Sequence, residues 1–451
     1  MRREQYQKLL MWKLSAKRRP LLVQGARQVG KSYLLEQFGK QEFPNFHVFN
    51  FEQDRSLARL FESDLYPKRI LTDLSIHRGE QIDHQSDLIV FDEIQACPRA
   101  LTGLKYFNEE FPEIALCCAG SLLGVALSPE SFPVGKVEFL DLHPMSFTEF
   151  LKALNEELLL DILESSAGLE SISLAAHGKL WDRLKDYYVV GGMPQAVLEF
   201  VSGTDDKMLA FKSVRSIQQQ LVESYYRDFA KHSGKTNSMH IVSVFEDIPR
   251  QLSRNFEGSV KRYQFKDVIP KKKSYNELRG PIDWLEKAGM IIRIRICDKA
   301  ELPLEAFCKR NLFKLVIFDI GLLGCMLDLP VEAVISQDYG ITKGYFAENF
   351  VAQEFRASGI KNLYSWSERN SEIEFLRIIN QEIVPVEVKA GTRTQAKSLR
   401  QYILKYSPRA AIKISGKPLD NKETKTVRHF PLYMAGKISK DSKIDLFKTR
   451  S

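Results

Sequence analysis

The sequence predicts an α/β protein with a doubly wound parallel sheet at its N-terminus, a helical and winged-helix-like middle, and a second α/β region at its C-terminus. An apolar strand, a glycine-bounded turn and a helical pattern follow one another over residues 20–38, and a second apolar strand ends in two acids at 92–93. Two strand-like segments follow near the C-terminus, at 371–376 and 383–389. Strands that alternate with helices in this way are typical of a parallel sheet.

The composition is that of a folded globular protein. Of 451 residues, 44% are hydrophobic and 27% are charged, which excludes a disordered or collagen-like chain and suggests about two to four domains. The longest apolar stretch, Ile114 to Leu127, has 14 residues, fewer than the roughly 20 that a membrane helix needs. The charged first twenty residues lack the apolar centre of a secretory signal. Six cysteines form no CxxC pair, so we expect neither a zinc site nor disulfides, and a cytoplasmic location.

The first strand, turn and helix match a phosphate-binding pattern. Leu21 to Val23 predict a strand, and the next eight residues, GARQVGKS, satisfy G-x-x-x-x-G-K-[ST]. Glycines let backbone N–H groups wrap a phosphate, and the following helix directs its positive end at the same anion. Lys31 would reach the β/γ-phosphates and Ser32 would hold Mg²⁺, whereas the alternative is a glycine turn with an incidental Lys-Ser pair. The predicted nucleotide-binding residues are Gly25, Ala26, Arg27, Gln28, Val29, Gly30, Lys31, Ser32 and Tyr33.

Two further strand ends supply polar groups for the same edge of the sheet. Leu88 to Phe91 form an apolar run typical of a buried parallel strand, and Asp92 and Glu93 follow it directly. Asp92 would act on Mg²⁺ and Glu93 would polarise the attacking water, unless the pair only caps the next helix. A strand at 115–119 precedes Ser121, which could sense the γ-phosphate or belong to an ordinary turn. We therefore expect Lys31, Asp92 and Glu93 to be catalytic, and Ser32 and Asp92 to hold the metal.

Longer segments resemble a known family. RREQYQKLLMWKLSAKRRPLLVQGARQVGKS, LIVFDEIQACPRALTGLKYF, CCAGSLLG and FPVGKVEFLDLHPMSFTEFL resemble the bacterial and archaeal AAA+-like P-loop ATPases of the "GARQVGKT…DEIQ" type, which carry an uncharacterised C-terminal companion domain. The resemblance runs to about Tyr402 and implies ATP as the nucleotide. Ser32 stands where these relatives usually have Thr, a change that keeps the hydroxyl for Mg²⁺.

The middle of the chain is predominantly helical and then basic. Residues 147–230 have helical apolar spacing, and residues 250–280 carry nine Lys/Arg against three acids. A helix at 275–288 precedes Met290 to Cys297, an alternating strand with Arg293 and Arg295 on one face. This order and the family resemblance predict a winged-helix-like element that binds DNA or another nucleic acid. The alternative is a solvated basic surface.

The C-terminal segment contains an acid and lysine array. Glu387 and Lys389 share one face of a strand, and Glu374 can lie beside Glu387 on the adjoining strand. With Glu348 on a preceding helix, these residues resemble the core of the PD-(D/E)XK nucleases over residues 344–402. The resemblance implies a second candidate site for Mg²⁺ or Mn²⁺, with Glu374 standing where Asp is commoner. The alternatives are a salt-bridge ladder across two strands and a nuclease-like fold without cleavage activity.

These observations predict four domains and an ATP-driven switch. The domains are a P-loop ATPase (1–150), a helical connector (151–235), a winged-helix-like basic domain (236–325) and a nuclease-like domain (326–451). We expect slow Mg²⁺-dependent ATP hydrolysis to control how the C-terminal half engages DNA or a protein, with oligomerisation open. The alternatives are an ATP-regulated metal-dependent nuclease and a non-enzymatic scaffold that ATP stabilises. The net charge of +8 is unevenly distributed, because residues 390–451 alone carry fifteen Lys/Arg against four acids.

Overall fold

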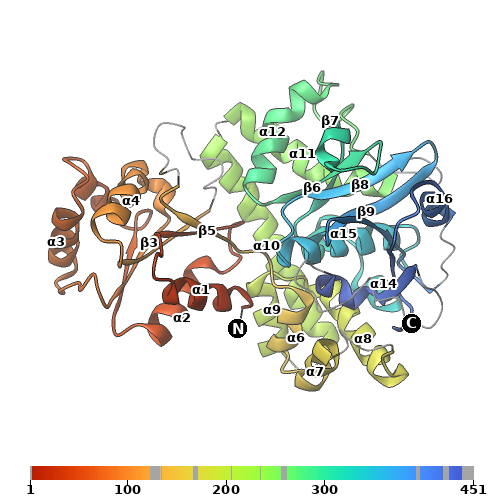
Figure 1. The fold of residues 1–451 in the computed structure, drawn as a ribbon, viewed down its shortest axis with the longest axis horizontal. Coiled ribbons are helices and arrows are strands. Elements are labelled where there is room, and N and C mark those ends of the chain that lie inside the picture. Colours follow the sequence, from red (N-terminus) through yellow and green to blue (C-terminus); the bar gives the residue numbers. More distant parts are fainter. Residues whose placement is uncertain are drawn as a thin grey trace. The chain divides into compact units, whose positions relative to one another are not determined.

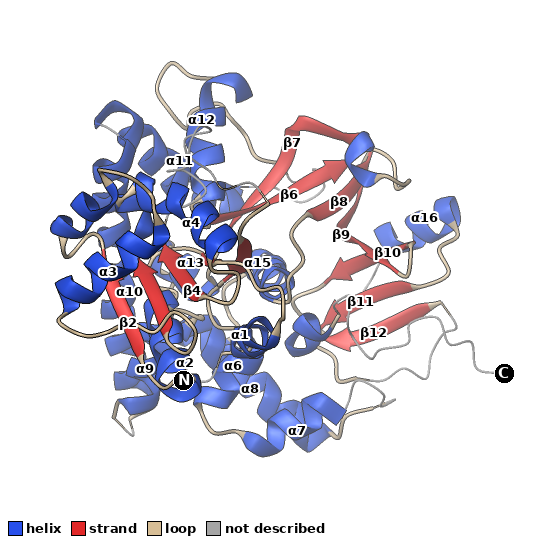
Figure 2. Cartoon of the chain, turned by 60° about the vertical axis from the view of Figure 1, so that its left-hand side comes forward, coloured by secondary structure: helices blue, strands red, loops and turns tan. Residues whose placement is uncertain are grey.

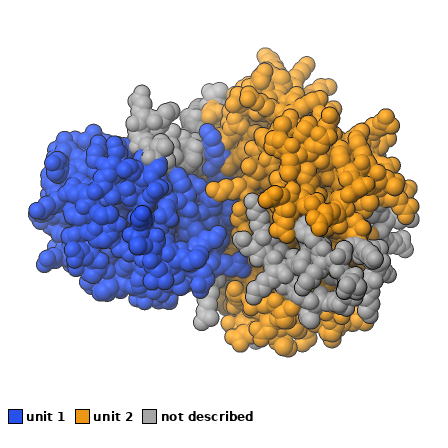
Figure 3. Space-filling model, viewed as in Figure 1, with its two compact units in different colours: residues 1–143, 287–289 blue, residues 144–286, 290–451 orange. Residues whose placement is uncertain are grey.

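The structure is a computed structural model, and in it the chain forms two compact units (Figure 1). The first comprises residues 1–143 and 287–289, and the second comprises 144–286 and 290–451 (Figure 3). The structure describes residues 3–121, 133, 135–165, 171–204, 206–233, 235–254, 262–392, 397–419 and 426–438. Parts of the two basic segments, at 255–261, 393–396, 420–425 and 439–451, lie outside the described residues. Within the described ranges no helix combines the length and apolarity needed to span a membrane.

The first unit is built on a parallel five-stranded sheet in the order β2-β3-β4-β1-β5. The predicted doubly wound sheet is therefore confirmed. Strand β3 is buried along its whole length, as its continuous apolar run predicts. The strands are β1 (Leu21–Gln24), β2 (Phe46–Asn50), β3 (Leu88–Asp92), β4 (Ala115–Gly120) and β5 (Glu138–Asp141).

Helices cover both faces of this sheet. Phe91 of β3 packs edge-on against Phe51, Phe61 and Phe107, which joins one face to the short helices and to α4. On α2, Phe38 packs against Trp12 of α1. Burying this apolar surface is the main force that holds the layers together. The helices are α1 (Gln5–Leu14), α2 (Lys31–Glu42), α3 (Pro67–Arg78) and α4 (Pro98–Glu110), with 3₁₀ turns η1 (Arg55–Phe61) and η2 (Ile94–Ala96).

The second unit begins with a helical region, as the apolar spacing predicts. The Gly191-Gly192 turn ends α8, and its Gly192 N–H donates to the buried Asp319 carboxylate at 2.6 Å. A Cβ at Gly192 would lie 2.1 Å from the Met145 carbonyl oxygen, so this close approach requires glycine. The helices are α6 (Phe147–Ala153), α7 (Glu157–Ser165), α8 (Leu174–Val190), α9 (Pro194–Ser202), α10 (Lys207–Ser233), α11 (Lys235–Arg254) and α12 (Tyr275–Lys287).

A seven-stranded mixed sheet in the order β12-β11-β10-β9-β8-β6-β7 forms the α/β part of this unit (Figure 2). Helix α15 contributes Phe355 against Phe375, and α16 contributes Tyr402 against Trp366. The strands are β6 (Ile291–Cys297), β7 (Cys308–Ile317), β8 (Leu363–Glu368), β9 (Ser371–Ile379), β10 (Glu382–Val388), β11 (Ala411–Ser415) and β12 (Val427–Pro431). The remaining helices are α13 (Ile320–Met326), α14 (Val331–Ser336), α15 (Thr342–Ala357) and α16 (Lys397–Tyr406), with 3₁₀ turns η4 (Leu304–Phe307) and η5 (Leu432–Lys437).

The winged-helix-like element is not confirmed. The predicted strand is present as β6, but it pairs with β7 on one side and β8 on the other, so it lies inside the large sheet. Its two arginines also have acidic partners. Arg293 is 2.6 Å from Asp283 and 2.8 Å from Glu286, and Arg295 is 3.5 Å from Glu305. These contacts use both guanidinium groups inside the protein.

Candidate functional site

The predicted phosphate loop joins β1 to α2 at the carboxyl edge of the first sheet. Gly25 has a φ of 151°, and a Cβ there would lie 2.0 Å from the Leu142 carbonyl oxygen. Gly30 has a φ of 94° and caps α2 in the left-handed region, so both positions require glycine. The loop therefore has the backbone shape that the motif predicts, and it leads directly into a helix N-terminus, where unpaired N–H groups favour an anion.

Lys31 is the first residue of α2, and its side chain turns back over the loop. Its Nζ donates to the carbonyl oxygens of Gly25 at 3.1 Å and Ala26 at 2.8 Å. Burial lowers the pKa of Lys31 to about 8, although the carboxylates of Glu93 and Asp92 oppose this shift. A buried ammonium group with a lowered pKa is well suited to bind an anion, because the anion would restore its missing solvation.

Ser32 and Asp92 meet, as the sequence predicts. The Ser32 hydroxyl lies 3.0 Å from both Oδ1 and Oδ2 of Asp92, and Asn50 donates to Oδ2 at 3.0 Å. Burial is the main cause that raises the pKa of Asp92, and the neighbouring Glu93 charge adds to it, whereas the Ser32 hydrogen bond lowers it. A hydroxyl beside a carboxylate at the end of a phosphate loop is a donor set suited to Mg²⁺.

Glu93 lies between β3 and η2 with a φ of 50°, an unusual conformation for a non-glycine residue. Its Oε2 accepts hydrogen bonds from the Ser121 hydroxyl at 3.3 Å and from the Gln95 amide. Arg27 of the loop donates to the same Ser121 oxygen at 3.2 Å and pairs with Glu52 at 3.5 Å. Arg27, Glu93 and Ser121, which lie far apart in the sequence, are thus joined by hydrogen bonds at one edge of the sheet.

Val29, Gln28 and Tyr33 are the other predicted binding residues, and their side chains make none of the contacts described above for Lys31, Ser32 and Asp92. Val29 is buried, and its carbonyl oxygen accepts from Arg3 at 2.7 Å. Gln28 adopts a φ of 63°, which continues the turn. Tyr33 follows on α2 and is 48% exposed, so its ring does not belong to the buried part of the loop.

Sequence reasoning missed Asn50, Glu52 and Gln95. Asn50 is paired in register with Asp92 across β2 and β3, so its position at the end of a parallel strand could have indicated it. Glu52 and Gln95 lie beyond their strand ends, where the backbone path of a turn decides which way a side chain points. No pattern in the sequence specifies that path.

The comparisons with known proteins agree with this geometry. Residues 17–151 match the family described as "AAA domain". These residues, which include the phosphate loop, Asp92 and Glu93, are similar to an AAA domain. Residues 182–333 and 343–433 of the same chain match two domains of unknown function, DUF8612 and DUF4143. No curated protein matches the chain.

The chain is also similar to solved structures, at low sequence identity and low TM-score. The ORC1 protein of Aeropyrum pernix, solved in complex with DNA, is 14% identical, covers 75% of this chain and 93% of its own, and has a TM-score of 0.27. The RuvB Holliday junction branch migration motor of Thermotoga maritima is 15% identical, covers 65% and 90%, and scores 0.30. PCH-2 of C. elegans is 11% identical, covers 48% and 66%, and scores 0.27.

Three residues of the predicted C-terminal array come together in the second unit. Lys389 Nζ lies 2.6 Å from Glu387 Oε1 and 3.5 Å from Glu374 Oε1, and Glu374 Oε2 accepts from the Val388 N–H at 3.1 Å. Burial and the Glu374 charge raise the pKa of Glu387 to about 7, while Lys389 opposes the shift. The two acids therefore share one ammonium group where β10 ends beside Glu374 of β9.

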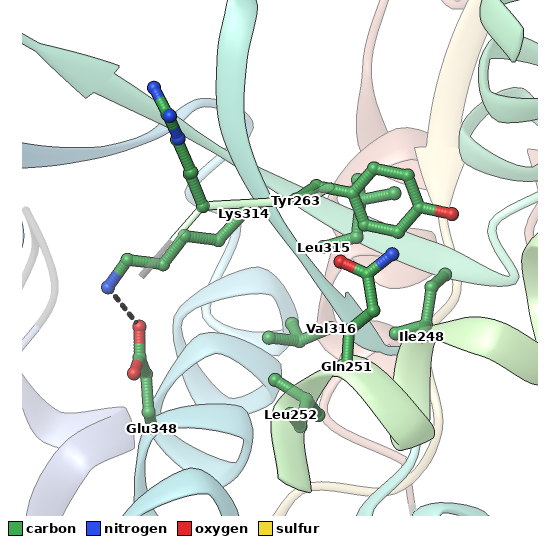
Figure 4. Close-up of a pocket in the computed structure, with 9 residues that line it drawn as sticks. Ile248, Gln251, Leu252, Tyr263, Lys314, Leu315, Val316 and Glu348 are labelled. Carbon is green, nitrogen blue, oxygen red and sulfur yellow. Dashed lines mark hydrogen bonds and ion pairs between the residues drawn. The ribbon is translucent and has the colours of Figure 1, made fainter. Parts of the chain in front are cut away.

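The fourth predicted residue, Glu348, belongs to a different cluster. Its Oε1 lies 2.6 Å from Nζ of the buried Lys314 (Figure 4). Lys314 also forms an ion pair with Glu372. Burial would lower the pKa of Lys314, but both carboxylates raise it above its usual range. The adjoining cavity has a volume of about 20 Å³, enough for a water molecule and too small for a nucleotide.

No metal-binding group is found in the described part of the chain. Within those ranges no three His, Cys, Asp or Glu side chains are arranged to hold an ion. The C-terminal acids are paired with lysines in this arrangement, because Lys389 contacts two of them and Lys314 contacts the third. The Ser32 and Asp92 pair of the AAA domain differs, since a nucleotide would supply phosphate oxygens as further ligands.

Proposed function

We propose that this protein binds ATP and hydrolyses it slowly in the presence of Mg²⁺, and that the nucleotide state controls how its C-terminal half engages DNA or a protein. The observation that supports this most strongly is the contact of the Ser32 hydroxyl with both Asp92 oxygens, at the end of a loop that buries Lys31. This arrangement brings a cation, a metal-ligand pair and a helix N-terminus to one place.

The residues of the loop fit the phosphates of a nucleotide. Gly25 avoids a clash with the Leu142 carbonyl oxygen and Gly30 supplies a left-handed φ of 94°, so both glycines keep the loop in its phosphate-wrapping shape. Lys31 would exchange its two carbonyl partners for phosphate oxygens. Ser32 and Asp92 would hold Mg²⁺, which supplies neutralising charge when bound. Glu93 would orient the attacking water and accept its proton during hydrolysis of the γ-phosphoanhydride.

The proposed switch rests on the separation of charge. The segments 250–280 and 390–451 are strongly basic, with net charges of +6 (nine basic residues minus three acids) and +11 (fifteen minus four), whereas the whole chain has only +8. The rest of the chain is therefore acidic, at 8 − 17 = −9. Basic segments attract polyanions by releasing counterions, which favours a nucleic acid over an uncharged partner.

The test compares binding of duplex DNA by full-length protein with Mg²⁺ alone, with ADP and with a non-hydrolysable ATP analogue. We expect the affinity to differ between the nucleotide states, and to fall with a log–log salt slope that reflects the phosphates contacted. The variant K31A should bind DNA equally in all three conditions. Its control is K40A, since Lys40 is an exposed residue of the same helix. Equal DNA affinity of the wild type in all states would disprove a DNA switch.

An ATP-regulated nuclease is the second candidate function. It is supported by the meeting of Glu374, Glu387 and Lys389, and opposed by the separate pairing of Glu348 with Lys314. Cleavage of duplex, single-stranded and RNA substrates with Mn²⁺, lost in E387A, would support it. If ATP binds but is never hydrolysed and never alters partner binding, the remaining reading is a scaffold that ATP stabilises.

A further inference from the structure

The hydroxyl of Ser121 has a complete set of hydrogen bonds. Arg27 Nε donates to its oxygen at 3.2 Å and Gln95 Nε2 donates to it at 3.5 Å. A serine hydroxyl has two acceptor lone pairs and one proton. Because two N–H donors occupy the lone pairs, the proton is left for Glu93 Oε2, which lies 3.3 Å away. Ser121 is 1% exposed, so water does not compete for these contacts.

Gln95 strengthens the same arrangement from the other side. Its Nε2 carries two protons, and the structure directs one at Glu93 Oε2 and the other at Ser121 Oγ. Glu93 also has a left-handed backbone conformation, with a φ of 50°, which sets the direction of its Cα–Cβ bond. The carboxylate oxygen is thus held by two donors, and one of them is itself oriented by the phosphate loop.

The guanidinium of Arg27 is steered toward Ser121 by an acid. Oε2 of Glu52, just beyond β2, lies 3.5 Å from Nη2 of Arg27, while Arg27 Nε faces Ser121. Arg27 also lies close enough to Lys31 for its charge to contribute to the lowered pKa of that lysine. The arginine therefore lies within the loop that would carry the phosphates and contacts the residue that holds the proposed base.

We infer that Arg27 is a positioning residue, which orients the Ser121 hydroxyl and through it the carboxylate of Glu93, so that the phosphate loop and the base act together. This inference rests on the proposed ATP hydrolysis and extends it to a residue that a minimal phosphate-loop motif leaves unspecified. A lysine could not replace Arg27 fully, because an ammonium group lacks the planar fork that contacts Ser121 and Glu52 at the same time.

The test is a double-mutant cycle on full-length protein, with ATP turnover and ATP affinity measured separately. For R27Q and for S121A we expect kcat to fall about 10-fold, while the Kd for ATP changes less than about 3-fold. The double variant R27Q/S121A should be no slower than S121A, because Arg27 acts through Ser121. R27K should fall between R27Q and the wild type, and R55Q, at an exposed arginine of the same unit, should match the wild type.

Several results would overturn the inference. Losses that multiply in the double variant would show that Arg27 acts independently of Ser121. A higher Kd with unchanged kcat in R27Q would assign the arginine to nucleotide binding alone. If R27Q does not fold, as judged by circular dichroism, the same comparison is made with R27K. A wild-type protein that binds no ATP would disprove the proposed function first, whereas binding and turnover with unaltered R27Q and R27K would disprove only the role of Arg27.

Discussion

The affinity for ATP should fall steeply between pH 7.5 and pH 9.5, because Lys31 loses its proton in this range. Burial in the phosphate loop lowers its pKa to about 8, from an ordinary value of 10.5. Only the protonated ammonium attracts phosphate oxygens, so binding in this range requires proton uptake by any deprotonated Lys31. The second ionisation of a phosphate lies near pH 6, so the charge of the nucleotide is almost constant over the same interval.

The magnitude follows from the protonated fraction of Lys31. With a pKa of about 8, roughly 76% of the molecules carry the charge at pH 7.5 and roughly 3% at pH 9.5. The Kd should therefore rise about 25-fold, equivalent to about 1.9 kcal/mol. A lysine with an ordinary pKa of 10.5 would lose only about a tenth of its charge, and the Kd would change by about 1.1-fold.

The assay is a titration of a fluorescent ATP analogue at several pH values in constant salt, with folding checked by circular dichroism. The variant K31R is the control, because arginine remains charged throughout this range, so its Kd should be independent of pH even if it binds more weakly. A wild-type Kd that stays constant while K31A abolishes binding would refute the reasoning. It would show that Lys31 contacts the nucleotide but is not desolvated.

Three further predictions concern stability. G25A should lower the stability of the first unit by several kcal/mol, since its Cβ would lie 2.0 Å from a carbonyl oxygen. G79A, with a φ of 72° but open space around it, should lower the stability by only about 1 kcal/mol. Thermal melts of the two variants test this difference. K314M should lower the free energy of unfolding by about 3–5 kcal/mol in a denaturant titration, because it removes the ammonium group that contacts Glu348 and Glu372. The double variant K314M/E348Q should recover part of this loss. An unchanged denaturation midpoint in K314M would contradict the prediction. The pKa of Glu387 is raised to about 7, so the folded state holds a proton that the unfolded state has lost, and the free energy of unfolding falls as the pH rises from 4.5 to 7. Over this window the free energy of unfolding of E387Q should rise by on the order of 1–3 kcal/mol relative to the wild type. Parallel pH profiles of the two proteins would refute this prediction.

The local parts of the nucleotide site could be predicted from the sequence, because they depend on short-range rules. The glycines of the loop specify its backbone, and a parallel strand that ends in an acid places Asp92 at the same edge as Ser32. Asn50 follows from the same rule, once the register of β2 and β3 is known. Arg27, Ser121 and Gln95 could not be joined in advance, since their contact depends on side-chain directions in three separate turns.

Only part of the C-terminal array could be predicted from local sequence patterns. The period of a strand places Glu387 and Lys389 on one face, and pairing of β9 with β10 brings Glu374 beside them. The partner of Glu348 is Lys314, which lies on β7 at the far edge of a seven-stranded sheet. The inclusion of β6 and β7 in that sheet, and therefore this ion pair, depends on pairing between distant strands, which spacing along the chain does not reveal.

Release of phosphate from ATP by full-length protein with Mg²⁺ tests the central proposal most directly. The wild type should release phosphate slowly, K31A should neither bind nor hydrolyse ATP, and E93Q should bind ATP with nearly wild-type affinity but turn it over at least about 100-fold more slowly. This separation of binding from turnover would assign Lys31 to the phosphates and Glu93 to the attacking water. Equal phosphate release by the wild type, K31A and E93Q would contradict the account.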